Sequence, residues 1–159
     1  MKHFIMAVLM LVVAGSAKAE NFGISQQLFP EEHCLALNIY YEARGSNLAD
    51  KAAVADVVLN RVEDTRYPNT ICDVVHDGYQ KGRRDCQFSW YCDGKSDIPQ
   101  DEDRWVEAQT IAWGIIKWDK YRGITEGATH YHATYVSPRW AKELQIVGRI
   151  GAHIFYRWE

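Results

Sequence analysis

The sequence predicts a mainly α-helical protein (α+β) with a small β element near the C-terminus. Apolar residues recur at helical spacing in three long segments between Pro30 and Gly123. The stretch 144–158 instead contains two short runs of strand-forming residues about a glycine-rich turn. A chain of 159 residues suits one domain, and no internal repeat or linker divides it.

The first 19 residues predict a secretory signal peptide. They combine a short basic start, an apolar core and the small-residue ending AKA, so cleavage is expected before Glu20. The apolar run is too short for a comfortable membrane span, and the mature domain, 20–159, is expected to have no stable span. Without Lys2 and Lys18 the formal charge changes from −3 to −5, which argues against a nucleic-acid partner. We expect an exported protein of the periplasm or cell envelope.

The first helix is expected to begin at Pro30, which suits the first helical position, and to end at a C-cap on Gly45. Leu35, Ile39 and Glu42 share one stripe of this helix, at spacings of four and three residues. Glu42 therefore lies at the end of an apolar face, close to the negative end of the helix dipole.

Burial and the helix dipole both raise the pKa of a carboxyl group in such a place. A glutamate that stays protonated near neutral pH can donate a proton to a leaving oxygen, as glycosidic cleavage requires. The sequence therefore makes Glu42 a candidate catalytic acid. The alternative is an ordinary ion pair with Arg44, Arg61 or Lys51.

The remaining elements follow in order. The second helix, 48–62, is apolar nearly all round and is expected to be central. A short helix over 71–78 has Asn69 or Thr70 as its cap, a fourth helix is expected over 101–123, and another short helix within 137–143. The stripe of the fourth helix consists of Trp105, Ala108, Ile111, Ala112 and Ile115.

An even number of cysteines in an exported chain favours two disulfides, and three pairings are possible. Cys86 and Cys92 can close a tight loop, in which case Cys34 and Cys72 join the first helix to a later segment. Zinc ligation is the less favoured alternative, because the chain has no Cys-x-x-Cys pair.

The loop between Cys86 and Cys92 is a candidate second wall of a substrate cleft. Gln87 and Ser89 would offer hydrogen-bonding groups there, and the aromatic residues of the loop would offer either sugar contacts or core packing. These aromatic residues are Phe88, Trp90 and Tyr91.

The segment THYHATY places His130, Tyr131 and His132 in alternation. On an extended segment the two histidines share one face and Tyr131 takes the other. We consider substrate binding near Glu42, a zinc site of His130, His132 and His153, and ordinary hydrogen-bonded histidines. The zinc site lacks an acidic ligand at motif spacing.

The segment ALNIYYEARGSNLADKAAVADVVLNRVEDTRYPNTICDVV resembles the opening of the SleB-type cell wall hydrolases. The resemblance continues through CQFSWYCDG and GATHYHATYVSPRWA to IGAHIFYR, in the expected order over most of the chain. It implies a lysozyme-like fold and a peptidoglycan-cleaving lytic transglycosylase, in which the glutamate of EARG, here Glu42, is the catalytic acid. It also favours Gln87 and Ser89 as substrate contacts.

The mechanism that this resemblance implies cleaves the bond between N-acetylmuramic acid and N-acetylglucosamine with one carboxylate and no cofactor or metal. The substrate partner is the peptidoglycan glycan strand. Spore-cortex members commonly carry a separate wall-binding module, which these 159 residues lack, so we do not expect spore cortex as the substrate.

Three other functions stay open at this point. A hydrolytic muramidase would need a second carboxylate, and no spacing singles one out among Asp50, Asp56, Asp73, Asp85, Asp93 and Asp97. A zinc amidase would lose turnover on chelation. A non-catalytic glycan-binding module would have no use for a buried acid.

Overall fold

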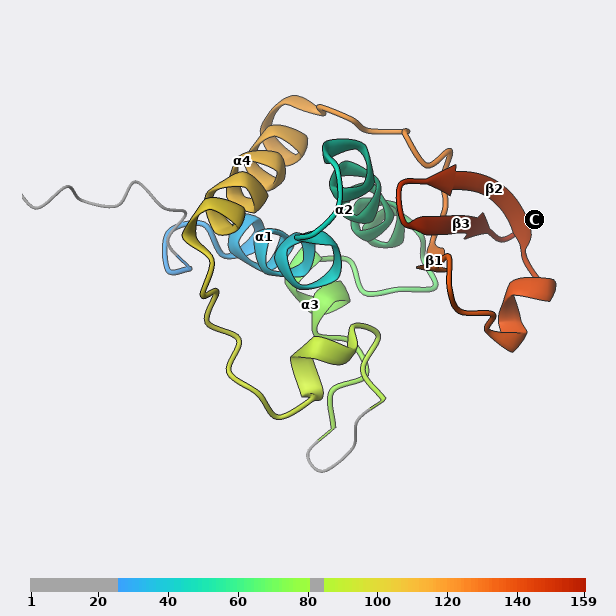
Figure 1. Ribbon diagram of the computed structural model, residues 1–159, viewed down its shortest axis with the longest axis horizontal. Coiled ribbons are helices and arrows are strands. Elements are labelled where there is room, and N and C mark those ends of the chain that lie inside the picture. The colour runs from blue at the N-terminus through green and yellow to red at the C-terminus, as the bar shows by residue number, and fades with distance from the viewer. Residues whose placement is uncertain (1–25, 81–84) are drawn as a thin grey trace, which may run out of the picture.

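The computed structural model describes residues 26–80 and 85–159, so the expected signal peptide lies outside the described residues. Within this part of the chain, four α-helices precede a three-stranded sheet. The helices gather on one side of the molecule and the sheet lies on the other (Figure 1). The expected helical fold with a small C-terminal β element is confirmed.

The helices are α1 (Pro30–Ala43), α2 (Leu48–Glu63), α3 (Ile71–Val75) and α4 (Glu102–Trp118). Three of them begin at a side-chain cap, which satisfies a backbone N–H that has no partner within the helix. Asn47 caps α2, Asp101 caps α4, and Thr70 rather than Asn69 caps α3.

Three expected helix ends were wrong. α3 ends at Val75, three residues before the expected Gly78. α1 ends at Ala43, and its C-cap Arg44 keeps right-handed helical angles, so Gly45 lies beyond the helix and is not a left-handed cap. α4 ends at Trp118, before Gly123, because Asp119 takes the left-handed conformation with φ of 51°. Aspartate is one of the few residues besides glycine that visits this region readily.

The core forms where α2 packs between the other elements. All seven residues from 52 to 58 are fully buried, which confirms the expected central helix. α1 contributes Leu35 and Ile39, and α4 contributes Ile111 and Ile115 from its expected stripe. Burying each such side chain stabilises the fold by about 1.5–3 kcal/mol.

The sheet has the strand order β1-β3-β2, with both pairs antiparallel. Its strands are β1 (His130–Ala133), β2 (Gln145–Ile150) and β3 (His153–Arg157), and a short 3₁₀-helix, η2 (Arg139–Lys142), precedes β2. The expected hairpin at the C-terminus is confirmed, and the expected short helix before it is η2.

Alternation along the strands gives the sheet two different faces. The inner face, which carries Tyr131, His153 and Phe155, is turned toward the helices; Phe155 packs with Ala53 and Val57 of α2. The outer face carries His130, His132 and Tyr156.

Both disulfides have the expected pairing, Cys34–Cys72 and Cys86–Cys92. The first joins α1 to α3, and the second closes the loop that contains the 3₁₀-helix η1 (Ser89–Cys92). None of the described helices is long and apolar enough to cross a membrane.

Candidate active site

Glu42 lies in the last turn of α1, on the stripe that buries Leu35 and Ile39. Its side chain is half-buried and accepts a hydrogen bond of 3.1 Å from the Tyr131 hydroxyl, so α1 and β1 meet at this carboxylate. The three cations that could have paired with it bind elsewhere: Arg44 reaches the Tyr40 hydroxyl, Lys51 pairs with Glu107, and Arg61 donates to the Thr129 carbonyl.

Burial raises the pKa of Glu42 above its ordinary value. The hydrogen bond from Tyr131 and the electrostatic influence of nearby His153 and Arg61 oppose this shift but do not cancel it. The position of Glu42 at the helix C-terminus disfavours its charge further. Compared with an exposed glutamate, Glu42 therefore keeps a larger protonated fraction near neutral pH. Its neighbours can still stabilise the ionised carboxylate.

Tyr131 is a fixed hydrogen-bond donor to Glu42. Burial, followed by the nearby charge of Glu42, raises the pKa of Tyr131 well above its ordinary value, so the phenol keeps its proton. The Tyr131 ring packs edge-on against His153, at 5.1 Å between ring centroids, and lies tilted against the Phe155 ring at 5.6 Å. These contacts hold the hydroxyl in place against the carboxylate.

A buried pair of Asp50 and His153 supports Tyr131 from behind. The Asp50 carboxylate is fully buried, binds the His153 ring nitrogen Nδ1 at 2.8 Å and accepts the backbone N–H of Ala152 at 3.1 Å. A Cβ at Gly151 would lie 2.6 Å from the Asp50 side chain, so the hairpin turn needs glycine there. Hydrogen bonds, chiefly from His153, lower the pKa of Asp50 despite its burial.

No pattern in the sequence indicates this pair. Asp50 was one of six aspartates that no spacing distinguished, and the two residues are 103 positions apart. Only the packing of the C-terminal hairpin against the start of α2 brings them together.

Arg61 of α2 joins the sheet to the disulfide loop. It is 5% exposed, and its guanidinium lies 5.3 Å from the Tyr67 ring and 5.2 Å from the Phe88 ring. Nη1 of Arg61 has no hydrogen-bond partner among the described residues. A buried cation beside Glu42 and Tyr131 is thus held by ring faces and one carbonyl, without a carboxylate partner in the described part of the chain.

The loop from Cys86 to Cys92 packs on the second half of α1. Phe88 and Trp90 are core residues, and Trp90 stacks on Tyr41 at 4.8 Å and donates to Asn38. Gln87, which precedes Phe88, and Ser89, which lies between Phe88 and Trp90, are exposed. The loop therefore anchors itself by its aromatic residues and presents its polar side chains to solvent.

His130 and His132 lie on the outer face, opposite to Tyr131. His130 contacts the Thr129 hydroxyl and the ring of Trp140; burial, with Arg61 and Arg66 nearby, lowers the pKa of His130 to about 4. His132 bonds the Tyr156 hydroxyl at 2.9 Å. Of the segment's three candidate residues, the structure brings only Tyr131 to Glu42.

The zinc alternative fails on the same geometry. His153 is on the inner face with Asp50, whereas His130 and His132 are on the outer face, so the three rings do not converge. Among the described residues, no group of three or more histidine, cysteine, aspartate or glutamate side chains is arranged to hold a metal ion.

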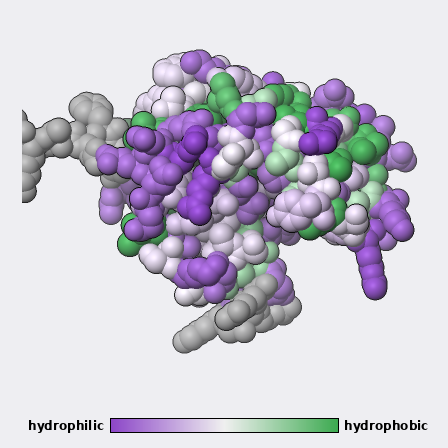
Figure 2. Space-filling model, viewed as in Figure 1, coloured by the Kyte–Doolittle hydropathy of each residue, from purple (hydrophilic) through white to green (hydrophobic). Residues whose placement is uncertain are grey.

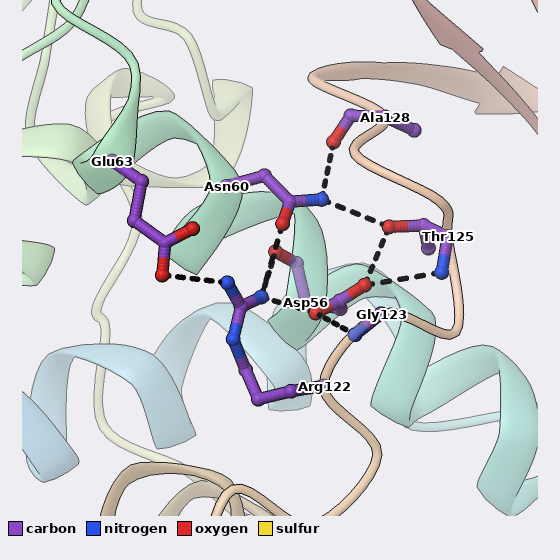
Figure 3. A network of polar contacts seen from close by, with 7 residues as sticks. All are labelled: Asp56, Asn60, Glu63, Arg122, Gly123, Thr125 and Ala128. Carbon is purple, nitrogen blue, oxygen red and sulfur yellow. Dashed lines mark hydrogen bonds and ion pairs between the residues drawn. The ribbon is translucent and has the colours of Figure 1, made fainter.

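Asp56, the second buried aspartate of α2, has a structural role. It accepts hydrogen bonds from the N–H groups of Gly123 and Thr125 and forms an ion pair with Arg122 (Figure 3). Asn60 extends the same network to Ala128. Asp56 therefore holds the turns between α4 and β1 in place. The Asp50 carboxylate is likewise occupied by its hydrogen bond with His153.

A family model described as Cell Wall Hydrolase matches residues 45–156, which is more than half of the chain and begins just after Glu42. The chain belongs to the cell wall hydrolase family.

This cell wall hydrolase is 29% identical over 123 residues to the "Spore cortex-lytic enzyme" of Bacillus subtilis (strain 168). The alignment covers 76% of this chain and 35% of that protein, so the chain spans about a third of the length of its curated relative.

Two solved structures share its fold. The catalytic domain of the germination-specific lytic transglycosylase SleB from Bacillus anthracis aligns with a TM-score of 0.60 and 28% identity, over 86% of this chain and 98% of that one. The catalytic domain of the Bacillus cereus SleB protein gives 0.57 and 27%, over 90% and 100%. The lysozyme-like fold that the family resemblance implied is thereby confirmed.

Proposed function

We propose that this cell wall hydrolase cleaves the glycosidic bond between N-acetylmuramic acid and N-acetylglucosamine as a lytic transglycosylase, with Glu42 as its single catalytic acid and base. The observation that carries the proposal is the half-buried Glu42 carboxyl group, with its raised pKa and its hydrogen bond from Tyr131. The similarity to a catalytic domain described as a lytic transglycosylase supports the reaction type.

The reaction needs two proton transfers at one carboxyl group. Protonated Glu42 donates its proton to the glycosidic oxygen as the bond to the anomeric carbon of the muramic residue breaks. The ionised Glu42 then takes the proton of the muramic C6 hydroxyl, whose oxygen attacks the anomeric carbon. The product is a 1,6-anhydro sugar, no water is consumed, and Glu42 ends protonated for the next cycle.

The neighbours of Glu42 suit both protonation states. While Glu42 is ionised, the Tyr131 hydroxyl and the buried Arg61 cation stabilise its charge. The Asp50–His153 pair holds the Tyr131 ring and with it the position of that donor. Asp50 and His153 act as positioning residues in this proposal, and Glu42 alone exchanges protons with the substrate.

The substrate would lie between the end of α1 and the loop from Cys86 to Cys92. Gln87 and Ser89 are exposed on that loop, and we assign them hydrogen bonds to sugar groups. Residues 1–19 would direct the chain out of the cytoplasm, where an enzyme of the cell envelope meets peptidoglycan.

The test is the substitution Glu42→Gln, which keeps the shape of the side chain and removes the transferable proton. We expect release of soluble fragments from purified sacculi to fall by at least about a hundredfold, the low end for losing a positioned acid, with little change in melting temperature. Glu63→Gln, at the exposed end of α2, serves as the matched control. Turnover retained in Glu42→Gln would end the proposal.

A further inference from the structure

We propose that a pocket on the outer face of the sheet binds a carboxylate of a peptidoglycan stem peptide, at a site separate from Glu42. The inference rests on the proposed function in one respect, because peptidoglycan is taken as the substrate. The pocket would provide a second contact with the substrate, in which the protein binds the peptide part of peptidoglycan.

The pocket lies between η2 and the outer face of β1 and β3. It has a volume of about 460 Å³ and is open to solvent. Its floor is formed by His132, Ile154 and Tyr156, and its rim by the segment that leads into η2. Hydrophilic side chains project from the part of the molecule where Figure 1 places η2 (Figure 2).

The chemistry of the lining favours an anion. Arg139 and Lys142 line the pocket, and neither forms a hydrogen bond or ion pair with another described residue. The side chains of Thr134 and Ser137 add hydroxyl donors beside them, while no carboxylate lines the pocket. In a chain with formal charge −3, two unpaired cations at one small pocket mark a local site for negative charge.

A carboxylate matches these donors better than a neutral sugar does, since arginine and lysine bind carboxylates by charge-assisted hydrogen bonds. The stem peptides of peptidoglycan carry free carboxylates, whereas its N-acetylated sugars are neutral. His132 and Tyr156, which are bonded to each other, and the side chain of Ile154 complete a floor for the aliphatic part of a peptide residue.

The pocket and the bond to be cleaved are on opposite faces of the sheet. Tyr131 points from β1 toward Glu42, and the next residue, His132, points into the pocket. A stem peptide bound there belongs to the peptide layer around the cleaved strand and not to the sugars at Glu42. The contact therefore retains the enzyme on peptide-bearing wall material without touching the reacting atoms.

The experiment measures binding separately from cleavage. Glu42→Gln protein, which cannot turn over in our proposal, is sedimented with insoluble sacculi at low and high salt. The test protein adds Arg139→Gln and Lys142→Gln, and the matched control adds Arg104→Gln and Lys120→Gln, the same charge change at α4 and just after it. Sacculi are used untreated, after amidation of their carboxyl groups, and after removal of phosphate-containing polymers by hydrofluoric acid.

We expect the test protein to bind untreated sacculi about threefold to tenfold less than the control, the range for two part-exposed ion pairs. Amidated sacculi should remove this difference, and acid-treated sacculi should keep it. Equal binding by test and control proteins overturns the proposal. A difference lost on acid treatment but kept on amidation assigns the site to phosphate and also overturns it. Because the assay measures binding and not cleavage, its result can be interpreted even if Glu42 is not the catalytic acid.

Discussion

The two faces of the three-stranded sheet give neighbouring residues of β1 different surroundings and different hydrogen-bond partners. On the inner face, the half-buried Tyr131 is hydrogen-bonded to Glu42 and packs against His153. On the outer face, His130 and His132 contact aromatic rings and an open pocket. Tyr131 contacts the Glu42 carboxylate, whereas His130 and His132, one residue before and after it in β1, point to the opposite face.

The comparison shows why residue type alone misplaces function here. Histidine is the usual candidate for proton transfer near neutral pH. Yet the pKa of His130 is lowered to about 4 by burial and nearby arginines, so its ring is neutral at pH 7. The tyrosine between the two histidines, whose pKa is raised well above its ordinary value, is the one that serves Glu42.

Tyr131→Phe probes the inner face and should have the largest effect of the three substitutions below. We expect kcat to fall by about tenfold or more, because a hydrogen bond to a charged group contributes about 1.5–3 kcal/mol. The bond from Tyr131 lowers the pKa of Glu42, so its loss raises that pKa. The alkaline limb of kcat/KM, which reports the group that must be protonated, should therefore move to higher pH.

Tyr156→Phe is the matched control, since it removes one hydroxyl from the outer face. It should leave the alkaline limb in place. A shift of equal size in both variants would remove the distinction between the two faces.

Asp50→Asn tests the support behind Tyr131. It should lower the free energy of unfolding by about 1–3 kcal/mol, the cost of leaving buried partners without a good acceptor. The folded-state pKa of Asp50 is lowered, so its contribution is present above the unfolded pKa, about 3.9, and is lost as pH falls through the folded value. Denaturant unfolding from pH 7 to pH 2 should show a smaller acid loss in Asp50→Asn than in wild type. Asp103→Asn, on the exposed first turn of α4, should change neither quantity.

His130→Ala should have the smallest effect on cleavage. We expect less than about a twofold change in turnover on peptide-free glycan strands, as for substitutions away from the reacting groups. Turnover and melting temperature are measured together, because the ring also packs against Trp140 and Trp158. A tenfold loss of turnover at an unchanged melting temperature would place His130 in the catalytic machinery.

Much of the fold could be predicted because it follows from local patterns. The stripe of α4, the apolar α2 and the Gly-rich hairpin each depend on residues within one segment. Two of the three wrong helix ends, those of α1 and α4, depended on more than residue type. α1 ends before it reaches Gly45, so this glycine does not act as its cap. α4 ends at Trp118, since the chain turns at Asp119 and then brings the N–H groups of Gly123 and Thr125 to the Asp56 carboxylate.

The candidate site could be predicted only in part. The position of Glu42 at the end of an apolar stripe was visible in the sequence, and so was the alternation that separates Tyr131 from the histidines. Which face meets α1 was not visible, because that depends on how the hairpin docks on the helices. The Asp50–His153 pair, and the hydrogen bond from Arg61 to the Thr129 carbonyl, arise from the same docking.

The most direct test of Glu42 as the single acid and base is mass analysis of fragments released from sacculi by wild-type enzyme in ¹⁸O-labelled water. The account predicts muropeptides that end in a 1,6-anhydro sugar and carry no label, because the substrate's own C6 hydroxyl attacks the anomeric carbon. Fragments with a reducing muramic end and ¹⁸O at the anomeric carbon would show that water attacks instead, and would contradict the account.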